Sequence, residues 1–168
     1  EIAVGTGLLP EGALQLIVGS TGDLLDRLGP QDVVAFTGSA ATALTLRTRP
    51  AIVEAGLRFN VEADSLNAAV LAPDVHPGAP AFERFIADVA REITQKAGQK
   101  CTAVRRILAP REVEEQVVEA LVAKLAAVVT GDPADPQVTM GPLAHGGQLR
   151  DALDGIAELL ATSELLHG

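Results

Sequence analysis

Short apolar runs alternate with helix-compatible stretches over the first part of the chain. The runs close at glycine or polar residues, as buried strands do, and cover residues 14–19, 33–36 and 57–62. Between them, residues 22–28 and 39–49 have the composition of helices. Because alternating strands and helices are typical of βαβ units, this pattern predicts an α/β fold with a Rossmann-like parallel sheet.

The local signals at the second of these helices are specific. Ser39 is a good N-cap, since its hydroxyl can accept a hydrogen bond from a free N–H group of the first turn. Pro50 should end or interrupt the helix, because proline cannot continue the hydrogen-bond ladder.

After about residue 64 the pattern changes to longer helical stretches. Residues 67–71 form a short apolar run that ends at a loop, and residues 104–108 predict a strand. Apolar side chains recur at helical spacing in three stretches, 82–97, 113–128 and 148–160, of which the first should end at Gly98.

The change of pattern also predicts a domain boundary. We place it near residues 62–67, so that 1–63 belongs to one domain and 64–168 to another. The chain begins without an initiating Met and stops without a closing element, and we therefore interpret it as an internal portion of a longer protein.

Composition narrows the classes of partner. Apolar residues make up 48% of the 168 residues, enough for a sizeable core. Acidic residues outnumber basic ones by 22 to 13, the formal charge is −9, and the longest basic cluster is Arg105-Arg106. Since nucleic-acid binding relies on basic patches, we expect no DNA or RNA partner.

No segment approaches the roughly 18 consecutive apolar residues of a membrane span, so we expect no membrane partner.

The single cysteine, Cys101, excludes an intrachain disulfide and any metal site built from several cysteines. The histidines at 76, 145 and 167 lie far apart without the spacing of metal ligands, and we expect no metal. An unpaired cysteine and the lack of a targeting segment favour the cytoplasm.

Cys101 is the first residue that could carry chemistry. It follows Gly98-Gln99-Lys100 at the end of the predicted helix, where the glycine lets the backbone turn sharply. The neighbouring Lys100 should favour the thiolate, which is the nucleophilic form. Two other interpretations stay open: a hydrolase or acyltransferase that pairs Cys101 with His76 or His145, and a non-catalytic protein in which Cys101 is a buried apolar residue.

Glu62 is the second such residue, at the end of a predicted apolar strand. A carboxylate at the carboxyl end of a strand in an α/β fold points toward the usual ligand crevice, where it can act as a general base. Asp64 is an alternative for the same role. The alternative is that Glu62 has no role in chemistry and is simply a solvated residue at a strand end or the partner of an arginine in an ion pair.

The turn Thr37-Gly38-Ser39 is the third. A glycine between strand and helix allows a phosphate to approach the backbone, and the helix N-terminus supplies free N–H groups. Ordinary helix caps share these features, and neither a GxGxxG nor a Walker A pattern occurs.

Taken together and in order, these motifs resemble the NAD(P)-dependent aldehyde dehydrogenase superfamily over essentially the whole chain. The resemblance rests on Val34–Ser39, on a glutamate after a strand, on Gly98-Gln99-Lys100-Cys101-Thr102-Ala103, and on the loop from Gly131 to Pro142. The stretch 61–67, VEADSLN, replaces the family's usual Glu-Leu-Gly-Gly-Lys and is similar to a bacterial branch that oxidises CoA-linked semialdehydes in the degradation of aromatic compounds.

The resemblance implies the following roles. Cys101 would attack the aldehyde carbon, with its own backbone N–H as one oxyanion donor, and Glu62 would activate the water that hydrolyses the thioester. The cofactor would be NADP or NAD, with NADP favoured, and it would be contacted by the turn Phe36, Thr37, Gly38 and Ser39. The segment 1–63 would be the end of the cofactor domain and 64–168 the start of the catalytic domain. The full-length protein would be a homo-oligomer acting on a small aldehyde, with a CoA thioester as the expected substrate class.

Overall fold

The computed structural model describes residues 5–168 of the chain, which divides into two compact units between Asp64 and Ser65. This division falls within the stretch 62–67, where the hydrophobic pattern changes. The assignment of the units to a cofactor domain and a catalytic domain stays a prediction, and each unit is described by itself below.

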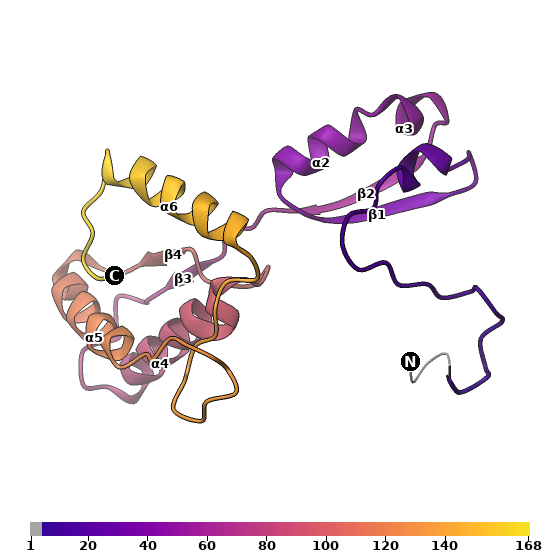
Figure 1. Ribbon diagram of the computed structural model, residues 1–168. Coiled ribbons are helices and arrows are strands. Elements are labelled where there is room, and N and C mark those ends of the chain that lie inside the picture. The colour runs from indigo at the N-terminus through magenta and orange to yellow at the C-terminus, as the bar shows by residue number, and fades with distance from the viewer. Residues whose placement is uncertain (1–4) are drawn as a thin grey trace. The chain divides into compact units, whose positions relative to one another are not determined.

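A pair of parallel strands joined by two helices forms the first unit. Its elements are a 3₁₀ turn η1 (Leu24–Arg27), β1 (Val33–Gly38), α2 (Ala40–Arg47), α3 (Pro50–Glu54) and β2 (Arg58–Ala63). The strands pair in register from Val33 opposite Arg58 to Gly38 opposite Ala63. Figure 1 shows α2 and α3 on the path between the two strands. This βαβ arrangement confirms the predicted α/β class with parallel pairing.

Local chemistry explains where the helices of this unit begin. The Ser39 hydroxyl accepts a hydrogen bond from the Thr42 N–H at 3.1 Å, so the predicted N-cap is confirmed. The single helix predicted over 39–49 is wrong at its end, since α2 stops at Arg47. Pro50 then begins α3, where its missing N–H costs nothing because the first turn has no intrahelical acceptor.

Two further predictions for the first unit are wrong. Residues 14–19 form no strand, and the side chains of Leu16 and Val18 are 87% and 89% exposed. A buried strand is stabilised by neighbours in a sheet, and this run has no partner strand among the described residues. The helix predicted over 22–28 is only the short 3₁₀ turn η1.

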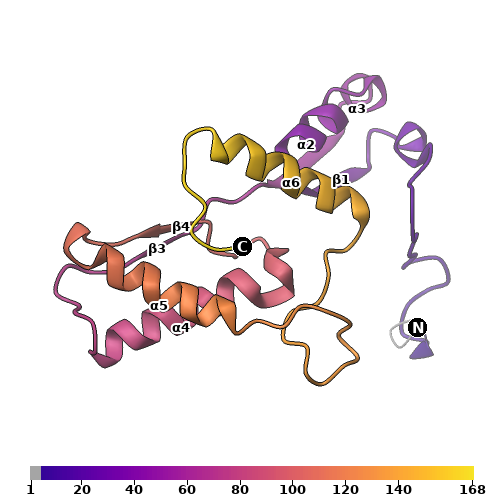
Figure 2. The ribbon, with the colours of Figure 1, turned by 60° about the vertical axis from the view of Figure 1, so that its left-hand side comes forward.

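The second unit is built on another parallel pair. Its elements are β3 (Ala68–Val70), α4 (Pro80–Thr94), η2 (Gln95–Gly98), β4 (Arg106–Leu108), η3 (Arg111–Val113), α5 (Glu114–Ala126) and α6 (Gly146–Leu160). The chain leaves β3, runs through α4 and returns to β4, with Ala68 opposite Arg106. Figures 1 and 2 show α4 and α5 side by side on one side of this strand pair, and α6 on the other side.

The core of the second unit lies where α4 and α5 pack against the strand pair. Its buried side chains follow the helical spacing seen in the sequence and are Leu71, Phe82, Ile86, Val89, Ala90, Val117 and Leu121. Helix α6 adds no buried residue and leaves its apolar side chains partly exposed. None of the helices in the described part of the chain is long and apolar enough to cross a membrane.

The end of α4 differs from the prediction. The helix stops at Thr94, four positions before Gly98, and continues as the 3₁₀ turn η2. Lys96, Ala97 and Gly98 have φ values of 54°, 53° and 71°, in the left-handed region. The chain therefore reverses direction before the cysteine motif instead of running into it as a helix.

The packing of α4 yields a first prediction. Ile86 is 1% exposed in the core, so replacing it by alanine in the 168-residue chain should lower the free energy of unfolding by about 2–5 kcal/mol, measured by urea denaturation. Ile156→Ala in α6 is the matched control, because Ile156 is 45% exposed, and it should cost clearly less. Equal losses for the two variants would contradict this placement of the core.

Candidate active site

Cys101 lies on a tight turn that follows the reversal at the end of α4. The Ala103 N–H donates a hydrogen bond to the Lys100 carbonyl at 3.1 Å, which closes a turn with Cys101 as its second residue. The Cys101 side chain is free of disulfides and exposed, whereas Ala103 is fully buried. The thiol therefore lies at the surface, while Ala103 at the end of the same turn is buried. The interpretation of Cys101 as a buried apolar residue is wrong for this structure.

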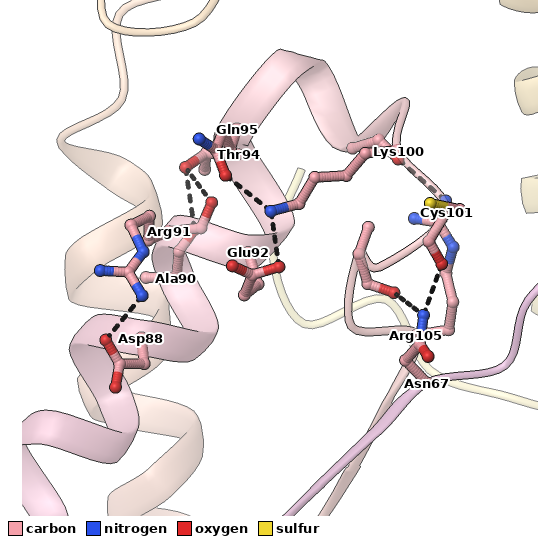
Figure 3. A network of polar contacts seen from close by, with 12 residues as sticks. Asn67, Asp88, Ala90, Arg91, Glu92, Thr94, Gln95, Lys100, Cys101 and Arg105 are labelled. Carbon is pink, nitrogen blue, oxygen red and sulfur yellow. Dashed lines mark hydrogen bonds and ion pairs between the residues drawn. The ribbon is translucent and has the colours of Figure 1, made fainter.

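The turn is anchored at its centre by Asn67, a residue that sequence reasoning missed. The Asn67 Nδ2 donates to the Cys101 carbonyl at 2.6 Å and lies 3.4 Å from the Ala103 carbonyl (Figure 3). The Asn67 backbone carbonyl in turn accepts hydrogen bonds from the N–H groups of Arg105 and Arg106, at 2.9 Å and 3.2 Å. The segment before β3 is therefore tied both to the turn of Cys101 and to the start of β4.

Gln99 and Arg105 hold the ends of the same loop. The Arg105 guanidinium donates to the Gly98 carbonyl at 2.8 Å. The Gln99 Oε1 accepts from the Ala144 N–H at 2.8 Å, and its Nε2 donates to the Lys96 carbonyl at 2.9 Å. The glutamine of the Gly-Gln-Lys-Cys motif thus acts as a structural link between the reversal and the loop before α6.

Lys100 does not serve the role that the sequence predicted for it. Its Nζ lies 2.6 Å from the Glu92 carboxylate and 2.6 Å from Oε1 of Gln95. Figure 3 shows its side chain running from the turn back to α4, away from Cys101. The side chains of Lys100 and Glu92 are only 15% and 25% exposed. The positive charge expected to favour the thiolate is therefore paired with Glu92, and Lys100 fixes the turn to the helix.

The predicted catalytic carboxylate Glu62 lies on β2 in the first unit, directly opposite Thr37 of β1 in the parallel register. Its side chain is exposed and makes no hydrogen bond to the described residues. Phe36 and Gly38, from the predicted cofactor turn, lie at the end of β1. A Cβ placed on Gly38 would approach the Phe36 ring to 2.5 Å, so the ring covers this glycine closely.

Asp64 has a different task from Glu62. Its Oδ1 accepts a hydrogen bond from the Ala40 N–H at 3.2 Å, at the N-terminus of α2, and its own N–H donates to the Gly38 carbonyl at 3.1 Å. Its φ of 50° lies in the left-handed region, which aspartate tolerates better than most side chains. Asp64 thus places a negative charge at the N-terminus of α2, where the resemblance implies a cofactor phosphate. Of the two carboxylates that the sequence offered as a base, Glu62 is therefore the one without a hydrogen-bond partner among the described residues.

The histidines do not form a dyad with the cysteine. The Nδ1 of His145 accepts hydrogen bonds from the N–H groups of Gly147 and Gln148 and caps α6. Within residues 5–168, no histidine is hydrogen-bonded to the Cys101 sulfur. A search of the same residues finds no group of three or more His, Cys, Asp or Glu side chains that could hold a metal ion.

Comparison with known proteins places this geometry in a family. Residues 2–168 match the model of the aldehyde dehydrogenase family, and the chain belongs to this family. It is 45% identical over 165 residues to the 3,4-dehydroadipyl-CoA semialdehyde dehydrogenase of Aromatoleum evansii, a match that covers 98% of this chain and 32% of that protein. The chain therefore spans about a third of the length of this curated relative.

Solved structures confirm the fold. The γ-glutamyl-γ-aminobutyraldehyde dehydrogenase from Burkholderia cenocepacia matches 81% of this chain and 27% of its own, with a TM-score of 0.69 and 31% identity. An indole-3-acetaldehyde dehydrogenase from P. syringae, solved in complex with NAD⁺, matches 95% of this chain and 32% of its own, with a TM-score of 0.77 and 26% identity. The resemblance inferred from the motifs is confirmed, and these relatives are oxidoreductases.

The Lys100–Glu92 pair yields a second prediction. Because both groups are largely buried, removing either partner leaves a charge without its counterion, so Lys100→Met and Glu92→Gln should each destabilise the chain. A double-mutant cycle by urea denaturation should give a coupling free energy of about 0.5–2 kcal/mol. The exposed pair Arg91–Asp88 on α4 is the control and should couple by less than about 0.5 kcal/mol. Equal coupling in the two cycles would contradict a structural role for Lys100.

Proposed function

We propose that this chain is part of an NAD(P)-dependent aldehyde dehydrogenase in which Cys101 is the nucleophile and Glu62 the general base. The observation that carries the proposal is the exposed thiol of Cys101, held on a turn that hydrogen bonds fix to α4, β3 and β4. Membership of the aldehyde dehydrogenase family supplies the reaction class.

In the proposed reaction the Cys101 sulfur, as thiolate, forms a bond to the aldehyde carbon, and the carbonyl oxygen takes the negative charge. The Cys101 N–H donates a hydrogen bond to this oxygen and stabilises the charge. A bound NAD(P) would supply a hydride acceptor next to this carbon, and loss of the hydride would leave the carbon as a thioester of Cys101. Glu62 then takes a proton from a water molecule, whose oxygen attacks the thioester carbon and displaces the Cys101 thiolate. The products are the carboxylate, the reduced cofactor, the Cys101 thiolate and two protons, of which Glu62 carries the first and passes it to solvent.

The arrangement of strands and helices in the first unit is compatible with the binding of a dinucleotide. The carboxyl end of β1 and the N-terminus of α2 are the elements at which α/β folds bind nucleotide phosphates. Thr37, Gly38 and Ser39 form the connection between them. The Asp64 carboxylate accepts the Ala40 N–H and the Ser39 hydroxyl accepts the Thr42 N–H, so we propose that the phosphates use the remaining N–H group of the first turn, that of Ala41. Both NAD and NADP are compatible with this proposal, with NADP favoured by the resemblance.

For the substrate we propose a CoA-linked semialdehyde of aromatic-compound degradation. The support is the 45% identity to the relative whose name contains that substrate class. A CoA thioester is strongly anionic, and in a chain with a net charge of −9 it needs local basic groups. Arg106 is exposed at the start of β4 and is one such group, whereas the Arg105 guanidinium is held by the Gly98 carbonyl. We further propose a cytoplasmic homo-oligomer as the full-length form.

The nucleophile is tested by Cys101→Ala in the full-length parent protein. NAD(P)H formation should fall by about a thousandfold or more, because no covalent intermediate can form. The cofactor dissociation constant should change less than about twofold, because Cys101 lies outside the predicted cofactor turn. Absorbance assays with a CoA-linked semialdehyde and a simple aliphatic aldehyde measure both the loss and the substrate class. Retained turnover in the variant would overturn the proposal.

The base is tested by Glu62→Gln in the same protein. Because the glutamate acts only after hydride transfer, a first burst of NAD(P)H should persist, with an amplitude near one per active site. Steady-state turnover should then fall by about 10²–10⁴-fold, because the thioester is no longer hydrolysed efficiently. Asp64→Asn is the companion variant and should keep turnover much closer to that of the wild type. Loss of the burst itself in Glu62→Gln would assign the carboxylate to an earlier step.

A further inference from the structure

The hydrogen bond that closes the turn of Cys101 does not by itself fix the position of the turn against the sheet. In a turn closed between its first and fourth residues, the central peptide adopts either of two orientations, which distinguish type I from type II turns. Here that peptide joins Cys101 to Thr102, and its oxygen is the Cys101 carbonyl. A type II turn needs a positive φ at its third residue, which the β-branched Thr102 does not have, so the orientation of this peptide does not depend on Asn67.

Asn67 is the group that contacts this peptide. Within the described residues, its Nδ2 is the only donor to the Cys101 carbonyl, at 2.6 Å. The same amide nitrogen lies 3.4 Å from the Ala103 carbonyl, and a primary amide has two N–H groups with which to serve both. Through these two contacts the amide joins both the centre and the end of the turn to the segment before β3.

Asn67 can hold the turn because its own backbone is held. Its carbonyl accepts the N–H groups of Arg105 and Arg106, just before β3 pairs with β4. Its side chain therefore starts from a point fixed by the sheet and reaches a residue 34 positions away in the sequence. Lys100 and Arg105 restrain the two ends of the loop, but neither touches the central peptide.

We propose that Asn67 is a positioning residue for the nucleophile: its amide ties the Cys101 and Ala103 carbonyls to the segment before β3 and so fixes the turn that presents the Cys101 thiol relative to β3 and β4. The inference rests on the proposed role of Cys101 and adds the means by which the chain orients it. Asn67 touches neither substrate nor cofactor in this scheme, so its removal should slow attack by the thiol and leave binding unchanged.

The test is Asn67→Asp in the full-length parent protein. Aspartate has nearly the same shape, but its ionised carboxylate donates no hydrogen bond and faces two carbonyl oxygens. The rate constant of the NAD(P)H burst should fall by about 10- to 100-fold, as expected for a misplaced reacting group. KM for the aldehyde and the cofactor dissociation constant should stay within about twofold of wild type. A wild-type burst rate in the folded variant would overturn the proposal.

Two further variants control for folding and charge. Gln116→Glu makes the same amide-to-acid change on an exposed side chain of α5 and should keep the wild-type burst rate. If Asn67→Asp does not fold, Asn67→Ala removes the donor without adding charge, and its burst should also be slowed. An equal slowing in Gln116→Glu, or a wild-type burst in Asn67→Ala, would overturn the proposal.

The outcome separates this inference from the proposed function. If Cys101→Ala keeps its turnover, the proposed nucleophile fails, and the role of Asn67 fails with it. If Cys101→Ala is inactive and Asn67→Asp has a wild-type burst, only the positioning role fails. A slowed burst with unchanged binding, in a protein whose Cys101→Ala variant is inactive, supports both.

Discussion

The reversal of the chain after α4 determines where the reactive thiol can lie. Parallel pairing of β3 with β4 requires the chain to cross over through α4 and then return to the start of the sheet. The return is made by consecutive left-handed residues, of which Lys96 and Ala97 each carry a steric cost of about 1–2 kcal/mol. Burial of Phe82, Ile86 and Val89 against the core offsets this cost. The turn with Cys101 occupies the short space between the reversal and β4.

Polar contacts, rather than a large apolar core, fix the details of this turn. The exposed loop has little apolar surface to bury, so its conformation depends on hydrogen bonds from Asn67, Gln99 and Arg105 and on the Lys100–Glu92 pair. Such bonds are each modest in net free energy but strongly directional, and several together select one backbone geometry. Lys100 illustrates the distinction: its charge stabilises the position of the loop, while the thiol next to it lies outside the ion pair.

The sequence predicted the parts of the fold that depend on local chemistry. The cap at Ser39 and the parallel βαβ connection of the first unit follow from side-chain type and periodicity, which act over a few residues. The strand expected at 14–19 is absent because its apolar side chains find no partner strand. The helix expected to reach Ala97 ends at Thr94 because contacts distant in sequence hold the reversal. Asn67 was missed for the same reason, since no local pattern marks a side chain that bonds 34 positions away.

One short segment contains residues that we propose for the chemistry of both units. Residues 62–67 contain Glu62, the proposed base, Asp64, which caps α2 beside the predicted cofactor turn, and Asn67, which holds the turn of Cys101. Asp64 adopts a left-handed φ at a point where the usual family sequence has glycine, and it brings a carboxylate that glycine lacks. A substitution in this segment therefore alters the charge at a helix terminus as well as the backbone. The departure from the common sequence at 61–67 thus falls on the residues that we propose as the base, as the cap beside the cofactor turn and as the support of the Cys101 turn.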